Sequence, residues 1–552
     1  MMAERIAAVL ERRADEPGRF EALARLLDDP QNRLELEDYL EAAIRRESGD
    51  VAARMYARAR FYAELVRREV ERLKAPSRHE VAENLKDQLP RILETLDTVL
   101  EVENAKLAAS FAMYLGIYFF MQSMFAEGVE VFDRLIETAR HSESHALLAR
   151  LHLSRGRCLL GLTKLADAAD SLDRASYEAE KAGDREAVAQ ALGVLGRIAI
   201  EQGDYAQSKL YSQSCLRMAE ELEDTALESI ALRNLGDLAL AHASYDEAEN
   251  SFQRSLAIAR ENGHEWLAAA SLSQLGILAS RQGQHEKAES SYREALAVFR
   301  SIDDRNGIAI TLLCISNLAV DQGLYEKAKR LLGESLVIHR RIGHRSGVAH
   351  SLSSLGLVAF YERNYGDAQR LYCQALAIHR ETGDQFYTAL ALLNLGGVSL
   401  NLRDYGRAAR QLAEAVNIAQ AIEVPELILA SLHNAGILMM RLGKPIAGGQ
   451  ILLGDIHERG VIGLSFQSGE RDELDEELAK LADALPASEI GQLKAQAESM
   501  SLEELAEYAL KALEEVRAEL GSAEPGEPDT AGQAIPAPAA GQSAITQNAD
   551  GK

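Results

Sequence analysis

Aromatic residues and cysteines are scarce in this chain of 552 residues. Phe, Trp and Tyr make up 5% of it, with Trp266 as the one tryptophan, although 47% of the residues are apolar. A core built mainly from Leu, Ala and Ile suits close packing of helix on helix. The four cysteines lie far apart and form no CxxC pair. We therefore expect reduced, buried thiols and no zinc site made of cysteines.

Positive charge is also in short supply. The chain has 60 Lys and Arg against 85 Asp and Glu, which gives a formal net charge of −25. Such a chain is not expected to bind nucleic acid or an anionic membrane, because both depend on cationic side chains. The first residues carry frequent charges and lack the apolar core of a signal peptide, and no apolar run is long enough to span a bilayer. We expect a cytoplasmic protein without membrane contact.

Proline is absent from residues 91–424, although the chain has 11 prolines in all. Proline removes a backbone hydrogen-bond donor and breaks helices, so a long stretch without it is typical of packed helices. This stretch also repeats itself. A Leu-Gly pair recurs at intervals of 40 or a multiple of 40, at Leu115-Gly116, Leu195-Gly196, Leu235-Gly236, Leu275-Gly276, Leu355-Gly356 and Leu395-Gly396.

Other columns of the sequence keep the same phase as the Leu-Gly pairs. An aromatic residue, usually tyrosine, follows most of the leucines after ten residues, as at Tyr245 and Tyr365, and an alanine usually comes three residues later. Glycine inside a helix costs about 1 kcal/mol relative to alanine, so its recurrence indicates that a neighbouring helix comes close. Further glycines, such as Gly203 and Gly383, stand where a helix is expected to end in a left-handed turn. Each unit is thus predicted to be two helices joined by tight turns.

This pattern resembles the tetratricopeptide repeat, which Leu275, Gly276, Gly283, Ala288, Tyr292 and Ala295 follow closely. The family's usual period is roughly 34 residues. The longer period here is similar to a subgroup that includes spindle-orientation adaptors, kinesin light chains and bacterial signalling regulators. The resemblance implies an all-α fold, a right-handed superhelical solenoid of antiparallel helix pairs. It also implies a protein that binds other polypeptides and is not an enzyme.

The repeat pattern divides the chain into four parts. Residues 111–460 are predicted to hold about eight repeats and a degenerate ninth. Residues 1–110 have helical spacing out of register with the repeats, and either cap the solenoid or form a small interaction module. Residues 461–521 are predicted to form acidic helices, one of them opened by a capping box of Ser501 and Glu504. Residues 522–552 are expected to be disordered because of their composition.

No arrangement of residues indicates catalysis or a bound cofactor. Phosphate-binding loops and the HExxH motif are absent from the sequence. His141 and His145 lie one helical turn apart but lack a third ligand. His339 and His379 occupy the same column of the repeat, which we interpret as a repeat feature and not as a functional pair. We therefore expect no catalytic residue, no metal and no cofactor.

The family resemblance places the first helix of each unit on a concave surface, and the repeat phase then gives candidate peptide-binding residues. They are polar positions near the Leu-Gly pairs: Arg157, Arg197, Arg233, Asn234, Gln274, Asn317, Ser354, Asn394 and Asn434. Amide side chains can donate to and accept from a peptide backbone at once. The arginines favour an acidic segment or a C-terminal carboxylate. Two plainer interpretations stay open: the amides brace neighbouring helices, and the arginines pair with carboxylates of the chain itself.

The leading hypothesis is a non-enzymatic adaptor or scaffold that holds a peptide or a disordered protein segment in the concave groove. The alternative is a regulator that responds to a ligand or signal peptide and controls its N-terminal region or a partner. If the arginines take part in binding, the partner is acidic. A homo-oligomer, or contact between the groove and the chain's own acidic residues 472–477, are further alternatives that the sequence leaves open.

Overall fold

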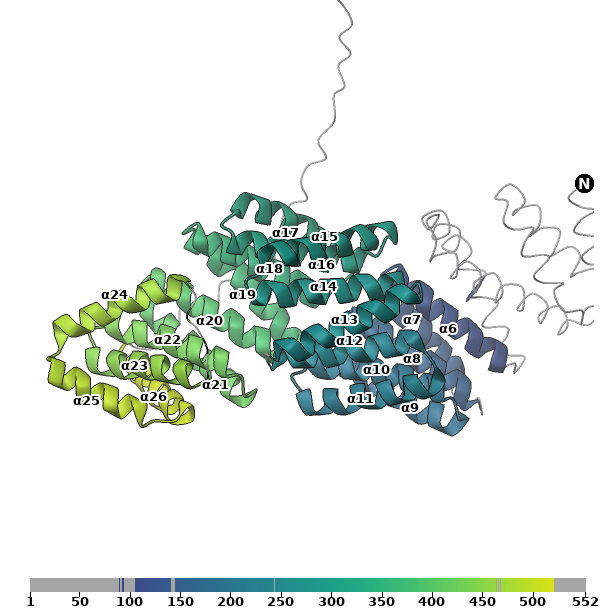
Figure 1. The fold of residues 1–552 in the computed structure, drawn as a ribbon, viewed down its shortest axis with the longest axis horizontal. Helices are drawn as coiled ribbons and strands as arrows, with labels where there is room; N and C mark the ends of the chain where they lie inside the picture. The colour runs from purple at the N-terminus through teal and green to yellow at the C-terminus, as the bar shows by residue number, and fades with distance from the viewer. Residues whose placement is uncertain are drawn as a thin grey trace, which may run out of the picture.

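The computed structural model describes residues 105–520, except residues 140–143, 243, 463, 465 and 467, together with residues 89, 92 and 93. Within these residues the chain is α-helical and has no β-strand, and helices α6 to α26 follow one another from one end of the molecule to the other (Figure 1). The predicted helical region over residues 1–110 lies mostly outside the described residues. The tail over residues 522–552 lies outside them entirely.

The helices form antiparallel pairs, with a first and a second helix in each repeat. The first helices are α6 (Ala105–Met121), α8 (His145–Gly161), α10 (Arg185–Glu201), α12 (Thr225–Ala241), α14 (Glu265–Arg281), α16 (Arg305–Asp321), α18 (Arg345–Tyr361), α20 (Gln385–Asn401) and α22 (Pro425–Arg441). The second helices are α7 (Phe125–Ala139), α9 (Leu165–Ala182), α11 (Tyr205–Leu222), α13 (Tyr245–Glu261), α15 (His285–Ser301), α17 (Tyr325–Arg341), α19 (Tyr365–Thr382), α21 (Tyr405–Ala421) and α23 (Pro445–Ile462). The predicted all-α, right-handed superhelical solenoid is confirmed. Among these described helices, none is both long and apolar enough to cross a membrane.

The glycine of several Leu-Gly pairs makes room for a large side chain. A Cβ atom at Gly236 would lie 2.5 Å from the ring of Phe252, and one at Gly276 would lie 2.5 Å from the ring of Tyr292. Both rings belong to the second helix of the same repeat and are buried. The close approach that the sequence predicts therefore exists, but a side chain of the partner helix takes the space.

The turns between helices use left-handed residues, as predicted. Gly203 and Gly283 follow first helices with φ of 78° and 72°, and Gly183 and Gly383 follow second helices with φ of 69° and 75°. Several equivalent turns carry other residues at positive φ: Thr163, Glu223, Asp303, Arg363, Arg403 and Glu423. A side chain in this conformation is strained relative to glycine.

The first helices lie on the inside of the superhelix. Successive first helices contact one another, whereas successive second helices make no comparable contact among the described residues. The superhelix is tight enough for distant repeats to meet. A Cβ atom at Gly343, just after α17, would lie 3.3 Å from Cδ2 of Leu162, just after α8. The rings of Phe120 and Trp266 also approach, with their centroids 6.1 Å apart.

The last helices, α24 (Ser468–Ala484), α25 (Ala487–Glu498) and α26 (Leu502–Leu520), fold back on the C-terminal repeats, at the yellow end of Figure 1. Helix α26 packs against α21, α22 and α23, and α24 packs against α22 and α23. The predicted capping box is present: the Ser501 amide donates to Glu504 (2.9 Å), and the Glu504 amide donates to Ser501 Oγ (3.2 Å). Glu473 of α24 forms a 2.7 Å ion pair with Arg441. In this structure the acidic segment therefore lies against the last repeats, and not against the arginines of the first ones.

Candidate binding surface on the inner face of the solenoid

The three predicted arginines lie on successive first helices: Arg157 on α8, Arg197 on α10 and Arg233 on α12. Burial, reinforced by the positive charge of Arg197, lowers the pKa of Arg233 to about 10. Burial also lowers the pKa of Arg157 to about 10, and here the neighbouring charge is Arg150 of the same helix. The structure thus brings Arg197 and Arg233 together, while Arg157 is grouped with Arg150.

Arg197 is paired within the chain. Its Nε donates to Oε1 of Glu201 at 2.8 Å. Burial by itself would lower the pKa of Arg197, but Glu201 and Asp237 outweigh it and raise the pKa above its ordinary value. For Arg197 the geometry therefore fits the interpretation that the arginine pairs with a carboxylate of the chain itself.

Arg157 and Arg233 differ from Arg197 because neither forms an ion pair with the part of the chain that the structure describes. Nη2 of Arg157 donates to the amide oxygen of Gln190 at 3.2 Å. The guanidinium of Arg233 lies over the ring of Trp266, 5.3 Å from its centroid. Arg233 is 8% exposed, and its Nε has no hydrogen-bond partner. With a pKa of about 10, both side chains stay charged at neutral pH.

Asp237 and Gln274 complete this part of the inner face. Burial raises the pKa of Asp237 to about 6, although Arg197 and Arg233 act in the opposite direction. A hydrogen bond from Gln274 also favours the charged carboxylate. Gln274, predicted to contact a peptide, is therefore engaged with Asp237 in this structure.

The predicted amide residues fall into two groups. Asn234 is fully buried, and its Nδ2 donates to the backbone oxygen of Gly193 on the preceding first helix at 2.8 Å. It braces two repeats and presents no surface to a partner, so its predicted place on the peptide-binding surface is wrong for this structure. Asn317 is exposed and accepts a 2.8 Å hydrogen bond from Ser354 Oγ. Asn394 and Asn434 are half-buried.

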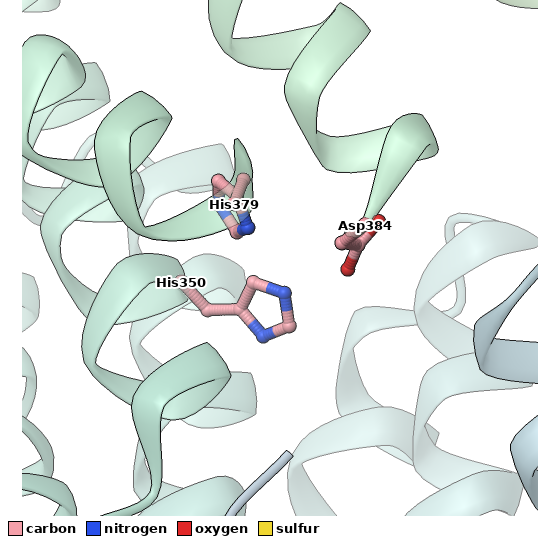
Figure 2. A group of neighbouring side chains, drawn as sticks. All are labelled: His350, His379 and Asp384. Carbon is pink, nitrogen blue, oxygen red and sulfur yellow. The ribbon is translucent and has the colours of Figure 1, made fainter. Parts of the chain in front are cut away.

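A second cluster on the later repeats was missed by the sequence analysis. His350 of α18, His379 of α19 and Asp384 at the N-cap of α20 have ligand atoms that all lie within 4.8 Å of one another. Figure 2 shows the three side chains turned toward a common space. Burial raises the pKa of Asp384 to about 6, and lowers the pKa of His379 to about 4.

The repeat register could have revealed this cluster. His379 shares a column with His339, which led us to interpret both as repeat features. His350 is the indicative residue, because no other repeat from 150 to 430 has a histidine in its column: Arg150, Gln190, Ile230, Ala270, Ile310, Leu390 and Ala430. His350 lies on the first helix of the repeat and His379 on the second helix. Comparing the columns of the two helices that pack together would have placed His350 near His379.

Comparison with known proteins agrees with this architecture. One tetratricopeptide repeat model matches residues 227–301 and 307–381, and a second matches residues 189–222. The repeats over these residues are therefore of the tetratricopeptide kind. Neither model is that of an enzyme family. None of the curated proteins matches the chain.

The solved structures that match this chain have low sequence identity to it. A Rap protein complexed with competence and sporulation factor is 14% identical, with a TM-score of 0.50 over 67% of this chain and 99% of that one. The apo form of the quorum sensor NprR from B. thuringiensis is 13% identical, with a TM-score of 0.41 over 68% and 99%. The signal transduction ATPase PH0952 from Pyrococcus horikoshii, with a tetratricopeptide repeat sensor, is 15% identical, with a TM-score of 0.40 over 80% and 74%.

Proposed function

We propose that this chain is a non-enzymatic binding protein that holds a peptide or disordered protein segment against the inner face of its solenoid. In this proposal Arg157 and Arg233 each receive an acidic group of the segment. The observation that carries it is the buried guanidinium of Arg233 and the half-buried side chain of Arg157, neither of which has an ion pair among the described residues. A buried charge is costly unless a partner compensates it, and a carboxylate suits a guanidinium in geometry and charge.

The later repeats contribute uncharged contacts to the proposed surface. Asn394 and Asn434 are half-buried, and their side chains make no hydrogen bond with described residues. An amide in this state can donate to and accept from the backbone of an extended segment whatever the segment's side chains are. The Rap protein structure, a complex with competence and sporulation factor, supports a binding role for this kind of solenoid.

The single tryptophan provides a direct test. Because the guanidinium of Arg233 lies over Trp266, a group that binds Arg233 should change the fluorescence of the full chain. Peptides would first be selected from a random display library on the full chain. We expect acidic or free C-terminal sequences to be enriched and to change the emission of Trp266. Amidation of the terminus, or replacement of the acidic residue by its amide, should weaken binding.

Variants identify the residues involved. Arg157→Gln and Arg233→Gln should each weaken binding of the selected peptides by about tenfold or more, because hydrogen bonds to charged groups contribute about 1.5–3 kcal/mol. Arg293→Gln is the matched control, since Arg293 lies on α15, a second helix, with its side chain 74% exposed. Selected peptides that bind both variants as tightly as the wild type would contradict the proposed site.

A further inference from the structure

The group formed by His350, His379 and Asp384 has the chemistry of a metal site. Two imidazoles and one carboxylate suit borderline divalent ions such as Zn²⁺ or Co²⁺. The three ligand atoms lie within 4.8 Å of one another, although the residues come from three consecutive elements, α18, α19 and the start of α20. Figure 2 shows them converging from separate helices.

Three of the four imidazole nitrogens in this group have no hydrogen-bond partner among the described residues. Both ring nitrogens of His379 and Nε2 of His350 are buried and lack a hydrogen-bond partner. His379 has no exposed surface at all. A neutral imidazole carries one N–H donor and one acceptor, and leaving both unsatisfied in a buried place is unfavourable. A metal ion bound to the free lone pair would satisfy the acceptor.

Other contacts orient the three side chains. Tyr387 packs against both imidazoles, with ring centroids 4.1 Å from His350 and 5.4 Å from His379. Oδ1 of Asp384 accepts a 3.0 Å hydrogen bond from the Tyr387 amide as the N-cap of α20. A carboxylate has a second oxygen, which stays available for a cation. Ligands held in place by their surroundings before binding are a condition for a tight site.

We propose that His350, His379 and Asp384 bind one divalent transition-metal ion of the zinc class on the inner face of the later repeats. Three protein ligands leave a position of a tetrahedral ion open to water. The ion would link two first helices, α18 and α20, through the second helix α19 between them. This inference is independent of the peptide-binding proposal, because it rests on different residues.

The experiment is a zinc titration of the full chain after removal of metal with a chelator. Isothermal titration calorimetry at neutral pH should give one Zn²⁺ per chain. His350→Gln, His379→Gln and Asp384→Asn should each weaken binding by more than about tenfold, because the loss of even an outer-shell partner costs 10–100-fold. Asparagine at 384 keeps an oxygen for the helix cap, so Asp384→Asn is the variant expected to preserve the fold.

The matched control is His339→Gln. His339 stands in the column of His379 one repeat earlier and also has a buried nitrogen without a partner, but it does not belong to the group of three. Zinc should bind this variant as it binds the wild type, and should raise the melting temperature of both but not of Asp384→Asn. A wild type that takes up no zinc, a control that loses it, or an Asp384→Asn chain that binds normally would each overturn the proposal.

Discussion

The early and the late repeats of this solenoid share one scaffold but carry different chemistry on the inner face. The column of the repeat that holds Arg150 in α8 and Gln190 in α10 holds His350 in α18. In the early repeats the arginines keep their charge at neutral pH. In the late repeats burial lowers the pKa of the histidines, to about 3 for His339 and about 4 for His379, so they are neutral.

This difference shows how a repeat separates position from chemistry. The Leu-Gly register sets where a side chain lies on the superhelix, and the residue type then decides what can bind there. Permanent positive charge in the early repeats suits an acidic group of a polypeptide. Neutral imidazoles beside a carboxylate in the late repeats suit a metal ion. Four predictions test whether the scaffold is shared and whether the two regions differ in the expected way.

The largest effect should come from filling the shared helix contact. A Cβ atom at Gly236 would lie 2.5 Å from Phe252, and one at Gly396 would lie 2.6 Å from Leu412. Gly236→Ala and Gly396→Ala should each lower the free energy of unfolding by about 1–3 kcal/mol, as overpacked cores do. Urea denaturation followed by circular dichroism measures this free energy of unfolding. Gly397→Ala is the control, because nothing lies within 4 Å of that position. If only one region responds, the scaffold is not shared.

The second effect is a loss of stability with acid in the late repeats. Burial, together with the nearby His344, lowers the folded-state pKa of His339 from 6.5 to about 3. Between these values the unfolded chain binds a proton that the folded chain does not. Stability should therefore fall as the pH drops below 6.5, by about 1.4 kcal/mol per pH unit for this histidine.

His339→Phe should remove this part of the pH dependence. Phe299 occupies the same column one repeat earlier and packs over Gly307 as His339 packs over Gly347, so the fold has room for a ring. His344 and His350, which also have lowered pKa values, remain in both proteins. Denaturation midpoints measured over a pH series should thus have a smaller slope in the variant. Equal slopes in the two proteins contradict the prediction.

The third effect has the opposite sign and belongs to the early repeats. Burial raises the folded-state pKa of Asp237 from 3.8 to about 6, so the folded chain takes up a proton before the unfolded chain does. Its contribution to stability should rise as the pH falls from 6 toward 3.8. Asp237→Asn should be more stable than the wild type at neutral pH by about 1 kcal/mol or less, because Asp237 is partly exposed. The same pH series measures the stability difference between the variant and the wild type. A variant that is less stable than the wild type at neutral pH would contradict the prediction.

The smallest effect concerns the turns, which both regions share. Glu223 and Glu423 have φ of 55° and 54°, where other repeats carry glycine. Glu223→Gly and Glu423→Gly should each raise the free energy of unfolding by about 0.5–1 kcal/mol. Glycine releases the strain of the left-handed turn, and the greater freedom that it gives the unfolded chain offsets part of this gain. Thermal unfolding detects such a gain. Glu220→Gly, inside α11, should lose stability instead.

Much of the fold was predictable because it depends on local, periodic features. The 40-residue register, the left-handed turn at Gly203 and the capping box of Ser501 and Glu504 all depend on residues close in sequence. The candidate binding residues were less predictable. Asn234 and Asn394 share a column, yet the first is buried as a brace and the second is half-buried. Their difference arises from the neighbouring helix, which the column does not describe.

The sequence by itself determined the kind of element, its length and the order of the helices, because glycine, proline and apolar periodicity act within one or two turns of chain. The tertiary structure decided which charges are paired and which side chains meet. Arg197 is paired with Glu201 and Arg157 has no ion pair with a described residue, although both stand in the same column. His350 and Asp384 come together only because α18, α19 and α20 pack side by side. Pairing and burial depend on neighbours from other helices, so only the packed superhelix specifies them.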